Sequence, residues 1–154
     1  MRRALAALTL LALPLASALP AQAAMQAEPK DFLGIPFAKP YEPDRTFSCQ
    51  RDSEEGLNCA RATDQLVLLG VPLKNLRYVF MQGYLYTVDA EVAGRENHDR
   101  LVAELTARHG KPETLQGGML SWSGTNVDIL LHYDASRKTG EVDYIYKNIP
   151  CGLE

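Results

Sequence analysis

Two runs of alternating residues, one on each side of a Gly-containing turn, constrain the fold of this chain more than any other feature. Between Leu76 and Val92, apolar and aromatic residues recur at every second position, and Gln82-Gly83 interrupts them at the centre. A period of two is typical of a strand with one buried face, and two such runs joined by a short turn are typical of a β-hairpin. The sequence therefore predicts a hairpin over residues 76–92.

The C-terminal third of the chain shows the same alternation. Residues 119–122 lead into a run over residues 126–133, and residues 141–146 continue the pattern beyond a polar turn at 134–140. We expect these runs to pair as a second hairpin. In the longest run the side chains divide into two faces, with Val127, Ile129, Leu131 and Tyr133 on one and Asp128, Leu130, His132 and Asp134 on the other.

One amphipathic helix is predicted between the two hairpins. Asn97 is expected to cap its N-terminus, and Gly110 and Pro112 are expected to end it. The side chains that fall on one helical face are His98, Leu101, Val102, Leu105 and His109. A helix of about three turns can cover one face of the sheet. His109 lies in the last turn, where we interpret it as a cation-capable residue at the negative end of the helix dipole.

The remaining segments have shorter patterns. Residues 32–37 are predicted to form a short strand that ends at a proline, and the polar residues 44–63 are predicted to form a loop. The sequence of 32–37 is echoed by residues 68–73, which we interpret as two similar strand starts rather than a repeat. Together the elements predict an α+β fold, with an antiparallel sheet of about four to six strands and one main helix packed on one face.

The N-terminal residues have the composition of a secretory signal peptide. Arg2 and Arg3 precede an apolar stretch over residues 4–19, and Ala21-Gln22-Ala23 offers small residues where a signal peptidase cuts. The stretch is shorter than the about 20 apolar residues of a membrane span. The predicted order is therefore a cleaved signal peptide (1–23), a polar leader (24–31) and a single α+β domain (32–154).

The mature chain is predicted to be periplasmic or secreted, and free of the membrane after cleavage. Without residues 1–23 it keeps 14 basic residues against 19 acidic ones, a net charge of −5. Nucleic acids and anionic membranes bind through clustered Lys and Arg, so neither is expected as a partner. An envelope protein or a small ligand remains as the expected partner.

Three cysteines, Cys49, Cys59 and Cys151, would enter an oxidising compartment. A bridge between Cys49 and Cys59 would order the polar segment between them and contribute about 2.5–3 kcal/mol by closing a short loop. A bridge from Cys151 to either of them would close a loop of roughly 90–100 residues. We predict a Cys49–Cys59 disulfide with Cys151 left over, and no zinc site, because no pair has the C-x-x-C spacing.

His132 and Asp134 come nearest to a catalytic or metal-binding arrangement. They share one face of a predicted strand and lie about 6.6 Å apart, whereas Asp128 lies about 13 Å from His132. An imidazole beside a carboxylate can act in acid–base chemistry or ligate a metal, but such a site needs further groups from other strands. A solvated sheet face is the simpler interpretation of these residues.

The sequence contains no G-x-S-x-G motif, phosphate loop or dinucleotide fingerprint. We assign no catalytic, metal-binding or cofactor-binding residue, and an enzyme is the less favoured class. Our hypothesis is a non-catalytic binding or protein-interaction module that uses an exposed sheet face or the disulfide loop. Its candidate ligand-facing residues are Tyr84, Tyr86, His132 and Asp134. The alternatives are a small metal-dependent or hydrolytic enzyme centred on His132 and Asp134, and a secreted enzyme inhibitor.

Short motifs along the mature chain resemble those of small exported bacterial proteins with an FLGIPF-type start. The matching features are residues 32–40, the cysteine-bearing loop, Gly83-Tyr84-Leu85 in the hairpin, His109-Gly110-Lys111-Pro112 at the helix end, and Trp122. Ala38 stands where such proteins often carry glycine. The resemblance implies a secreted α+β domain and carries no functional residue to this chain.

Overall fold

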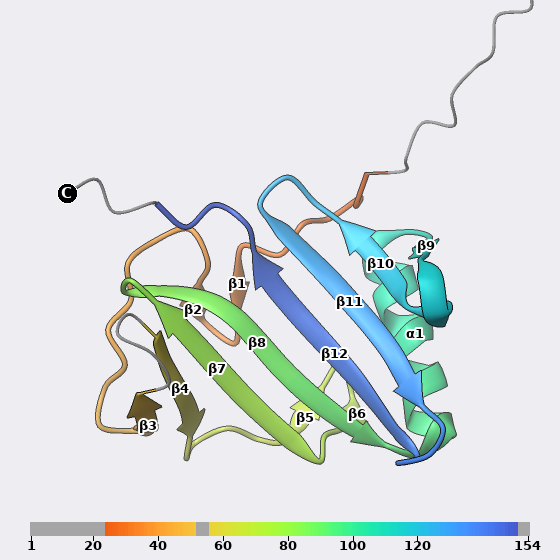
Figure 1. The fold of residues 1–154 in the computed structure, drawn as a ribbon, viewed down its shortest axis with the longest axis horizontal. Coiled ribbons are helices and arrows are strands. Elements are labelled where there is room, and N and C mark those ends of the chain that lie inside the picture. The colour runs from red at the N-terminus through yellow and green to blue at the C-terminus, as the bar shows by residue number, and fades with distance from the viewer. Residues whose placement is uncertain (1–23, 52–55, 151–154) are drawn as a thin grey trace, which may run out of the picture.

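The computed structural model describes residues 24–51 and 56–150. The predicted signal peptide and Cys151 lie outside these residues. One sheet dominates the described chain, and its eight strands are antiparallel throughout (Figure 1). In spatial order the strands are β3 (Phe47–Arg51), β4 (Gly56–Arg61), β7 (Asn75–Met81), β8 (Tyr84–Ala93), β12 (Thr139–Tyr146), β11 (Val127–Asp134), β10 (Leu120–Ser123) and β9 (Glu113–Thr114).

The predicted α+β class is confirmed, because residues 24–51 and 56–150 contain a large antiparallel sheet and one α-helix. Both predicted hairpins form, as β7–β8 around Gln82-Gly83 and as β11–β12. Strands β8 and β12 pair with each other and join the two hairpins at the centre of the sheet. The predicted number of four to six strands is wrong, since the main sheet has eight.

The additional edge strands come from segments without a clear alternating pattern. Residues 44–63, predicted to be a loop, contain the hairpin β3–β4, which pairs with the edge of β7. Only one side of β4 meets the core, where Cys59 lies opposite Tyr78. Cys49 lies directly opposite Cys59, and the predicted disulfide joins them. Backbone hydrogen bonding to β7 thus orders a polar segment whose side chains alone predict no strand.

Two very small hairpins account for the echoed sequences. Residues 32–37 are not the single strand predicted, because the chain reverses at Leu33-Gly34, and it reverses in the same way at Leu69-Gly70. At both turns the two central residues have positive φ, with 49° at Leu33 and 52° at Leu69. This is the requirement of a type I′ turn, so the echo is one turn geometry used twice. The strands are β1 (Asp31–Phe32), β2 (Ile35–Pro36), β5 (Val67–Leu68) and β6 (Val71–Pro72).

The helix α1 (Gly94–His109) starts earlier than predicted. β8 runs directly into it at Ala93, and the side-chain amide of Asn97, the predicted cap, donates a hydrogen bond of 2.9 Å to the Ala93 carbonyl from within the first turn. The predicted buried face is largely confirmed, with His98, Leu101, Leu105 and His109 buried. No helix in the described ranges has the length and apolar character to cross a membrane.

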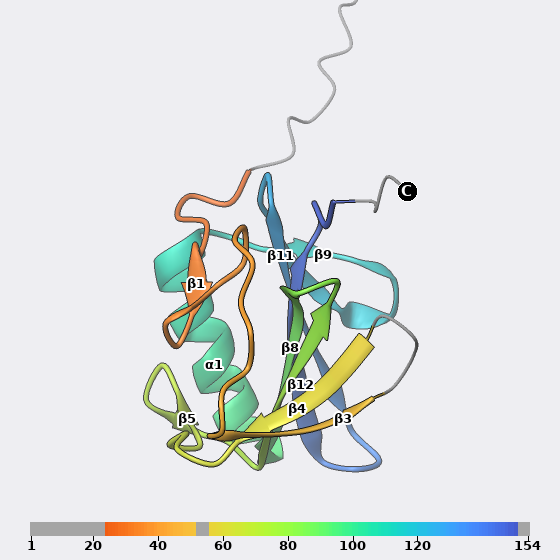
Figure 2. The same ribbon diagram turned by 90° about the vertical axis from the view of Figure 1, so that its left-hand side faces the viewer.

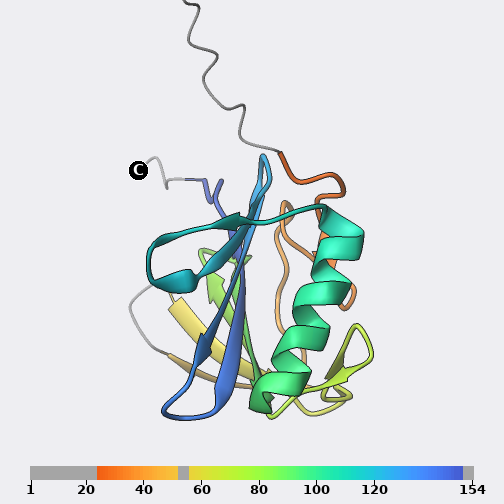
Figure 3. The same ribbon diagram turned by 90° about the vertical axis from the view of Figure 1, so that its right-hand side faces the viewer.

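The helix and both small hairpins lie on the same side of the sheet (Figures 2 and 3). The core fills the space between them and the sheet. Its largest fully buried side chains are Trp122, Tyr78, Phe37, Phe80, Ile35, Leu85, Leu101, Leu105, Ile129, Leu131, Val71 and Val88. The other face of the sheet has no covering element among the residues described, and we call it the open face.

Candidate functional site: the open face of the sheet

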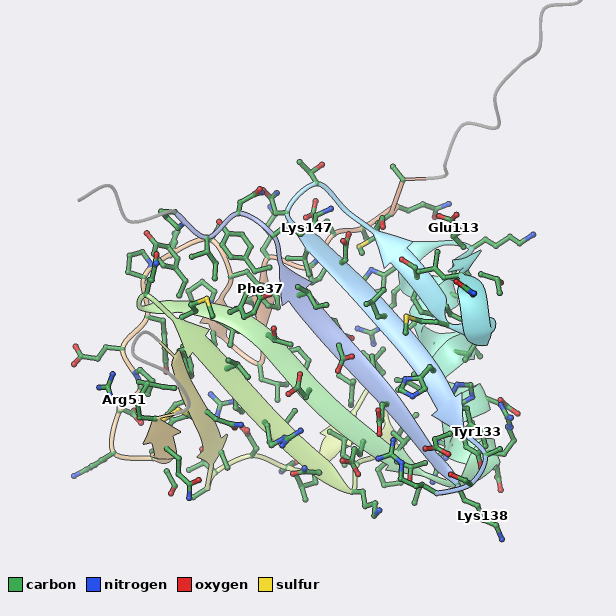
Figure 4. All side chains as sticks on the ribbon, in the orientation of Figure 1. Phe37, Arg51, Glu113, Tyr133, Lys138 and Lys147 are labelled. Carbon is green, nitrogen blue, oxygen red and sulfur yellow. A yellow bond between two sulfur atoms is a disulfide. The ribbon has the colours of Figure 1, made fainter. Side chains whose placement is uncertain are left out.

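Polar side chains gather on the open face, which faces the viewer in Figure 4 with Lys138 near one end and Lys147 near the other. Alternation along the central strands buries one set of side chains against α1 and directs the other set to this face. At its centre is a depression of about 390 Å³, which we call the polar hollow. Its lining residues are Asn75, Arg77, Thr87, Asp89, Ala90, Glu91, Arg137, Glu141, Asp143 and Ile145.

Two pairs of carboxylates face each other in the polar hollow. In the pairing of β12 with β8, Asp143 lies directly opposite Asp89, and Glu141 lies directly opposite Glu91. Like charges at opposed positions destabilise a sheet. Burial, reinforced by the charges of Asp89 and Glu141, raises the pKa of Asp143 to about 6. Burial also raises the pKa of Asp89.

Cations reach the polar hollow from its rim. The ion pairs are Arg77–Asp89 at 3.7 Å, Lys74–Glu91 at 3.8 Å, and Arg137–Glu141. The cationic side chains are about half exposed, so solvent screens each pair and its contribution is small. Within the described part of the chain, Asp143 belongs to no ion pair. The centre of the hollow therefore keeps negative charge that the fold does not neutralise.

His132 and Asp134 interact with different partners and not with each other. The Asp134 carboxylate accepts hydrogen bonds from the backbone and hydroxyl of Ser136, at 2.8 and 2.6 Å, and from the backbone and guanidinium of Arg137. These donors hold the pKa of Asp134 well below its usual range. Asp134 thus organises the turn between β11 and β12. His132 instead faces Glu141 on β12, with 3.5 Å between Nε2 and Oε2.

Tyr84 and Tyr86 also lie apart from His132. Tyr84 follows the turn of the β7–β8 hairpin and packs, half-buried, against the core. Tyr86 falls at an irregularity in the pairing, where Phe80 pairs with Leu85 but Val79 pairs with Thr87. None of the four candidate residues, Tyr84, Tyr86, His132 and Asp134, lines the polar hollow.

Sequence reasoning missed the carboxylates of β8 and β12. The alternation over residues 76–92 does place Asp89 and Glu91 on the face opposite Val88. This alternation does not indicate the register between β8 and β12, which places Asp89 opposite a residue far away in the sequence. A single sequence carries no signal for that pairing.

The fold and this surface define an α+β domain whose antiparallel sheet is covered on one side and carries an acidic hollow on the other. Among the described residues, no three His, Cys, Asp or Glu side chains are grouped as metal ligands would be. A search of protein-family models, curated proteins and solved structures finds no match to this chain.

Proposed function

We propose that this chain is an exported, non-catalytic binding module, periplasmic or secreted, that meets a basic partner through the polar hollow. The observation that carries the proposal is the direct opposition of Asp143 to Asp89 and of Glu141 to Glu91. The Cys49–Cys59 disulfide supports export, because disulfides persist in oxidising compartments.

A cationic side chain from a partner fits this surface in charge and in size. Placed between the opposed carboxylates, a Lys or Arg group would replace repulsion with attraction. A volume of about 390 Å³ lies within the usual range for small binding sites. The net charge of −5 for the mature chain adds long-range attraction for a basic partner.

The two alternatives from the sequence are not favoured equally. An enzyme centred on His132 and Asp134 loses support, because the Asp134 carboxylate is occupied by Ser136 and Arg137. A secreted enzyme inhibitor is compatible with the same surface, since an inhibitor is a binding module whose partner is an enzyme. Binding through the polar hollow is therefore the property to test.

The test uses the mature chain, residues 24–154, and an octalysine peptide as the probe. We expect binding that weakens as salt is added, because the attraction is between exposed charges. The double variant Glu91→Gln/Glu141→Gln should bind about tenfold more weakly, measured by titration calorimetry.

The control is Glu42→Gln/Glu104→Gln, which removes the same charge from exposed positions outside the hollow. If this control weakens binding as much as the variant in the hollow, only net charge matters and the site is wrong. Absence of octalysine binding at low salt would also reject the proposal.

A further inference from the structure

A second cavity, of about 460 Å³, lies on the covered side of the sheet. It opens between the two type I′ turns and the C-terminal end of α1, and we call it the leucine cleft. Its apolar wall comes from Phe32 and Leu33 on one small hairpin and from Leu68 and Leu69 at the other. The polar hollow is on the opposite face, so a ligand held in the leucine cleft would bind independently of the proposed basic partner.

The walls of the leucine cleft are fixed in place. A guanidinium nitrogen of Arg61 donates to the Leu33 carbonyl at 3.3 Å, and one of Arg100 donates to the Gly70 carbonyl at 3.2 Å. The Asp31 carboxylate, which also lines the cleft, accepts from the backbone N–H of Gly34 at 3.2 Å. Each turn is thus held by a side chain from another part of the fold or from its own first strand, and the cleft is preformed.

Leucine at the two turns is unfavourable for the local backbone conformation but adds apolar surface to the cleft. A type I′ turn prefers Asn or Gly at its first central position, because leucine resists a positive φ. The third such turn, at Gln82-Gly83, has a polar residue there. Leu33 and Leu69 adopt this angle, and both are apolar residues that line the cleft.

Tyr144 brings a hydrogen-bonding group to the inside of the cleft. Only 4% of its surface is exposed, and its ring packs edge-on against Phe32 with 5.0 Å between centroids. The Tyr144 hydroxyl has no hydrogen-bond partner among the described residues. Since every fully buried side-chain nitrogen or oxygen of these residues does have a partner, the Tyr144 hydroxyl is not fully buried. It is therefore open to the cleft that Tyr144 lines. Burial raises the pKa of Tyr144, so the hydroxyl keeps its proton and can donate it.

His109 and Arg108 complete the polar end of the cleft. His109 Nδ1 lies 2.5 Å from the Ala27 carbonyl and must donate to it, while burial lowers the pKa of this imidazole. Burial therefore favours the neutral imidazole, which weakens the interpretation of His109 as a cation-capable residue at the helix dipole. Arg108 is exposed, lines the cleft and belongs to no ion pair within the described chain.

We propose that the leucine cleft binds a medium-chain fatty acid. The carboxylate would accept hydrogen bonds from the Tyr144 hydroxyl and the Arg108 guanidinium, and the alkyl chain would lie against the leucine walls. Among the described residues, the cleft offers one hydroxyl without a partner, one cation without an ion pair and an apolar wall, which match the three parts of such a ligand. The Asp31 carboxylate, which also lines the cleft, is engaged by the backbone N–H of Gly34.

The experiment compares decanoate and decylamine, each below its micelle concentration, and decanol below its solubility limit, on the mature disulfide-bonded chain by titration calorimetry. We expect decanoate to bind most tightly and decylamine least. Arg108→Gln should weaken decanoate about tenfold and leave decanol unchanged, because only the carboxylate carries a charge. Tyr144→Phe should weaken both decanoate and decanol, since both accept from the hydroxyl.

Two further variants keep the result decisive. Lys111→Gln removes an exposed cation near Arg108 that lies outside the lining, and should change nothing. Leu69→Asn suits the turn backbone and should weaken decanoate and decanol alike while the protein stays folded. Equal binding of the three ligands, no binding of decanoate, or equal effects of Arg108→Gln and Lys111→Gln would each overturn the proposal.

Discussion

At the scale of single residues, Asp143 shows how strongly a neighbour in space changes a side chain. Its carboxyl faces Asp89 across two paired strands and is partly buried, which raises its pKa to about 6 from an ordinary value of 3.8. Between about pH 4 and pH 6 the folded chain holds a proton that the unfolded chain has already released. The free energy of unfolding contributed by this group therefore falls as the pH rises through that window.

Asp143→Asn should stabilise the protein above pH 6 and have little effect at pH 4. The amide cannot ionise, so it escapes the cost of a buried charge beside Asp89, about 1–2 kcal/mol after allowance for solvent screening. Urea denaturation at pH 4, 6 and 8 measures the difference. Asp128→Asn is the control, because Asp128 pairs with Lys147 at 2.9 Å and its loss should not stabilise at pH 8. A variant no more stable than wild type at pH 8 would contradict the raised pKa.

The sequence predicts which way a side chain faces better than what it contacts. The alternation in residues 126–133 correctly separates Ile129 and Leu131 from His132. It does not indicate that Asp134 turns to Ser136 and Arg137, or that His132 faces Glu141. Contacts of that kind depend on turn geometry and strand register, which lie beyond a period of two.

At the scale of elements, long amphipathic segments are predictable and short ones are not. The strands β7, β8, β11 and β12 and the helix each bury one full face, so their patterns are strong. The β3–β4 hairpin buries little, and β1, β2, β5 and β6 have only two residues each. The β3–β4 hairpin depends on backbone pairing with β7. The two-residue strands depend on turns with positive φ, which leave only a Leu-Gly signature in the sequence.

The disulfide should matter most for the edge hairpin. Replacing Cys49 and Cys59 with alanine opens a short loop in the unfolded chain and should lower the free energy of unfolding by about 2.5–3 kcal/mol. Urea denaturation measures this loss. Amide hydrogen exchange should accelerate in β3 while the central strands β8 and β12 stay protected.

Cys151→Ser is the matched control for the paired cysteines and should leave stability unchanged. Treatment of the wild-type chain with a thiol reductant should reproduce the loss seen in the double alanine variant. If Cys151→Ser proves as destabilising as the double variant, the pairing differs from the one in the structure.

At the scale of the whole molecule, the segment predicted to be a polar leader, residues 24–31, forms hydrogen bonds with both the sheet and the end of the helix. The backbone N–H of Met25 donates to Ser123 at 3.0 Å, and that of Gln26 donates to His109 at the end of α1, also at 3.0 Å. Met25 packs against the core. The body of the fold thus extends to residues close to the predicted cleavage site, which composition does not indicate because the anchors are mostly backbone groups.

Glu28 is the side chain on which this attachment depends. Its carboxylate accepts the backbone N–H groups of Thr125 at 3.0 Å and Asn126 in the β10–β11 turn, and of Val127 at 2.6 Å at the start of β11. A Cβ at Gly124 would approach Glu28 Oε1 to 2.9 Å, so the turn and the carboxylate fit closely. Three donors on one charged acceptor make a strong local contact between the N-terminal segment and the sheet.

Glu28→Ala should therefore lower the free energy of unfolding by about 1–3 kcal/mol, because three backbone donors lose their acceptor. Glu28→Gln should cost less, since the amide oxygen still accepts but carries no charge. Urea denaturation ranks the two variants, and amide exchange at Thr125, Asn126 and Val127 should accelerate in the same order. Glu42→Ala, at an exposed position away from this turn, should leave both measurements unchanged. If Glu28→Ala matches Glu42→Ala, the N-terminal segment is held by its backbone bonds and by Met25, and the carboxylate contributes nothing.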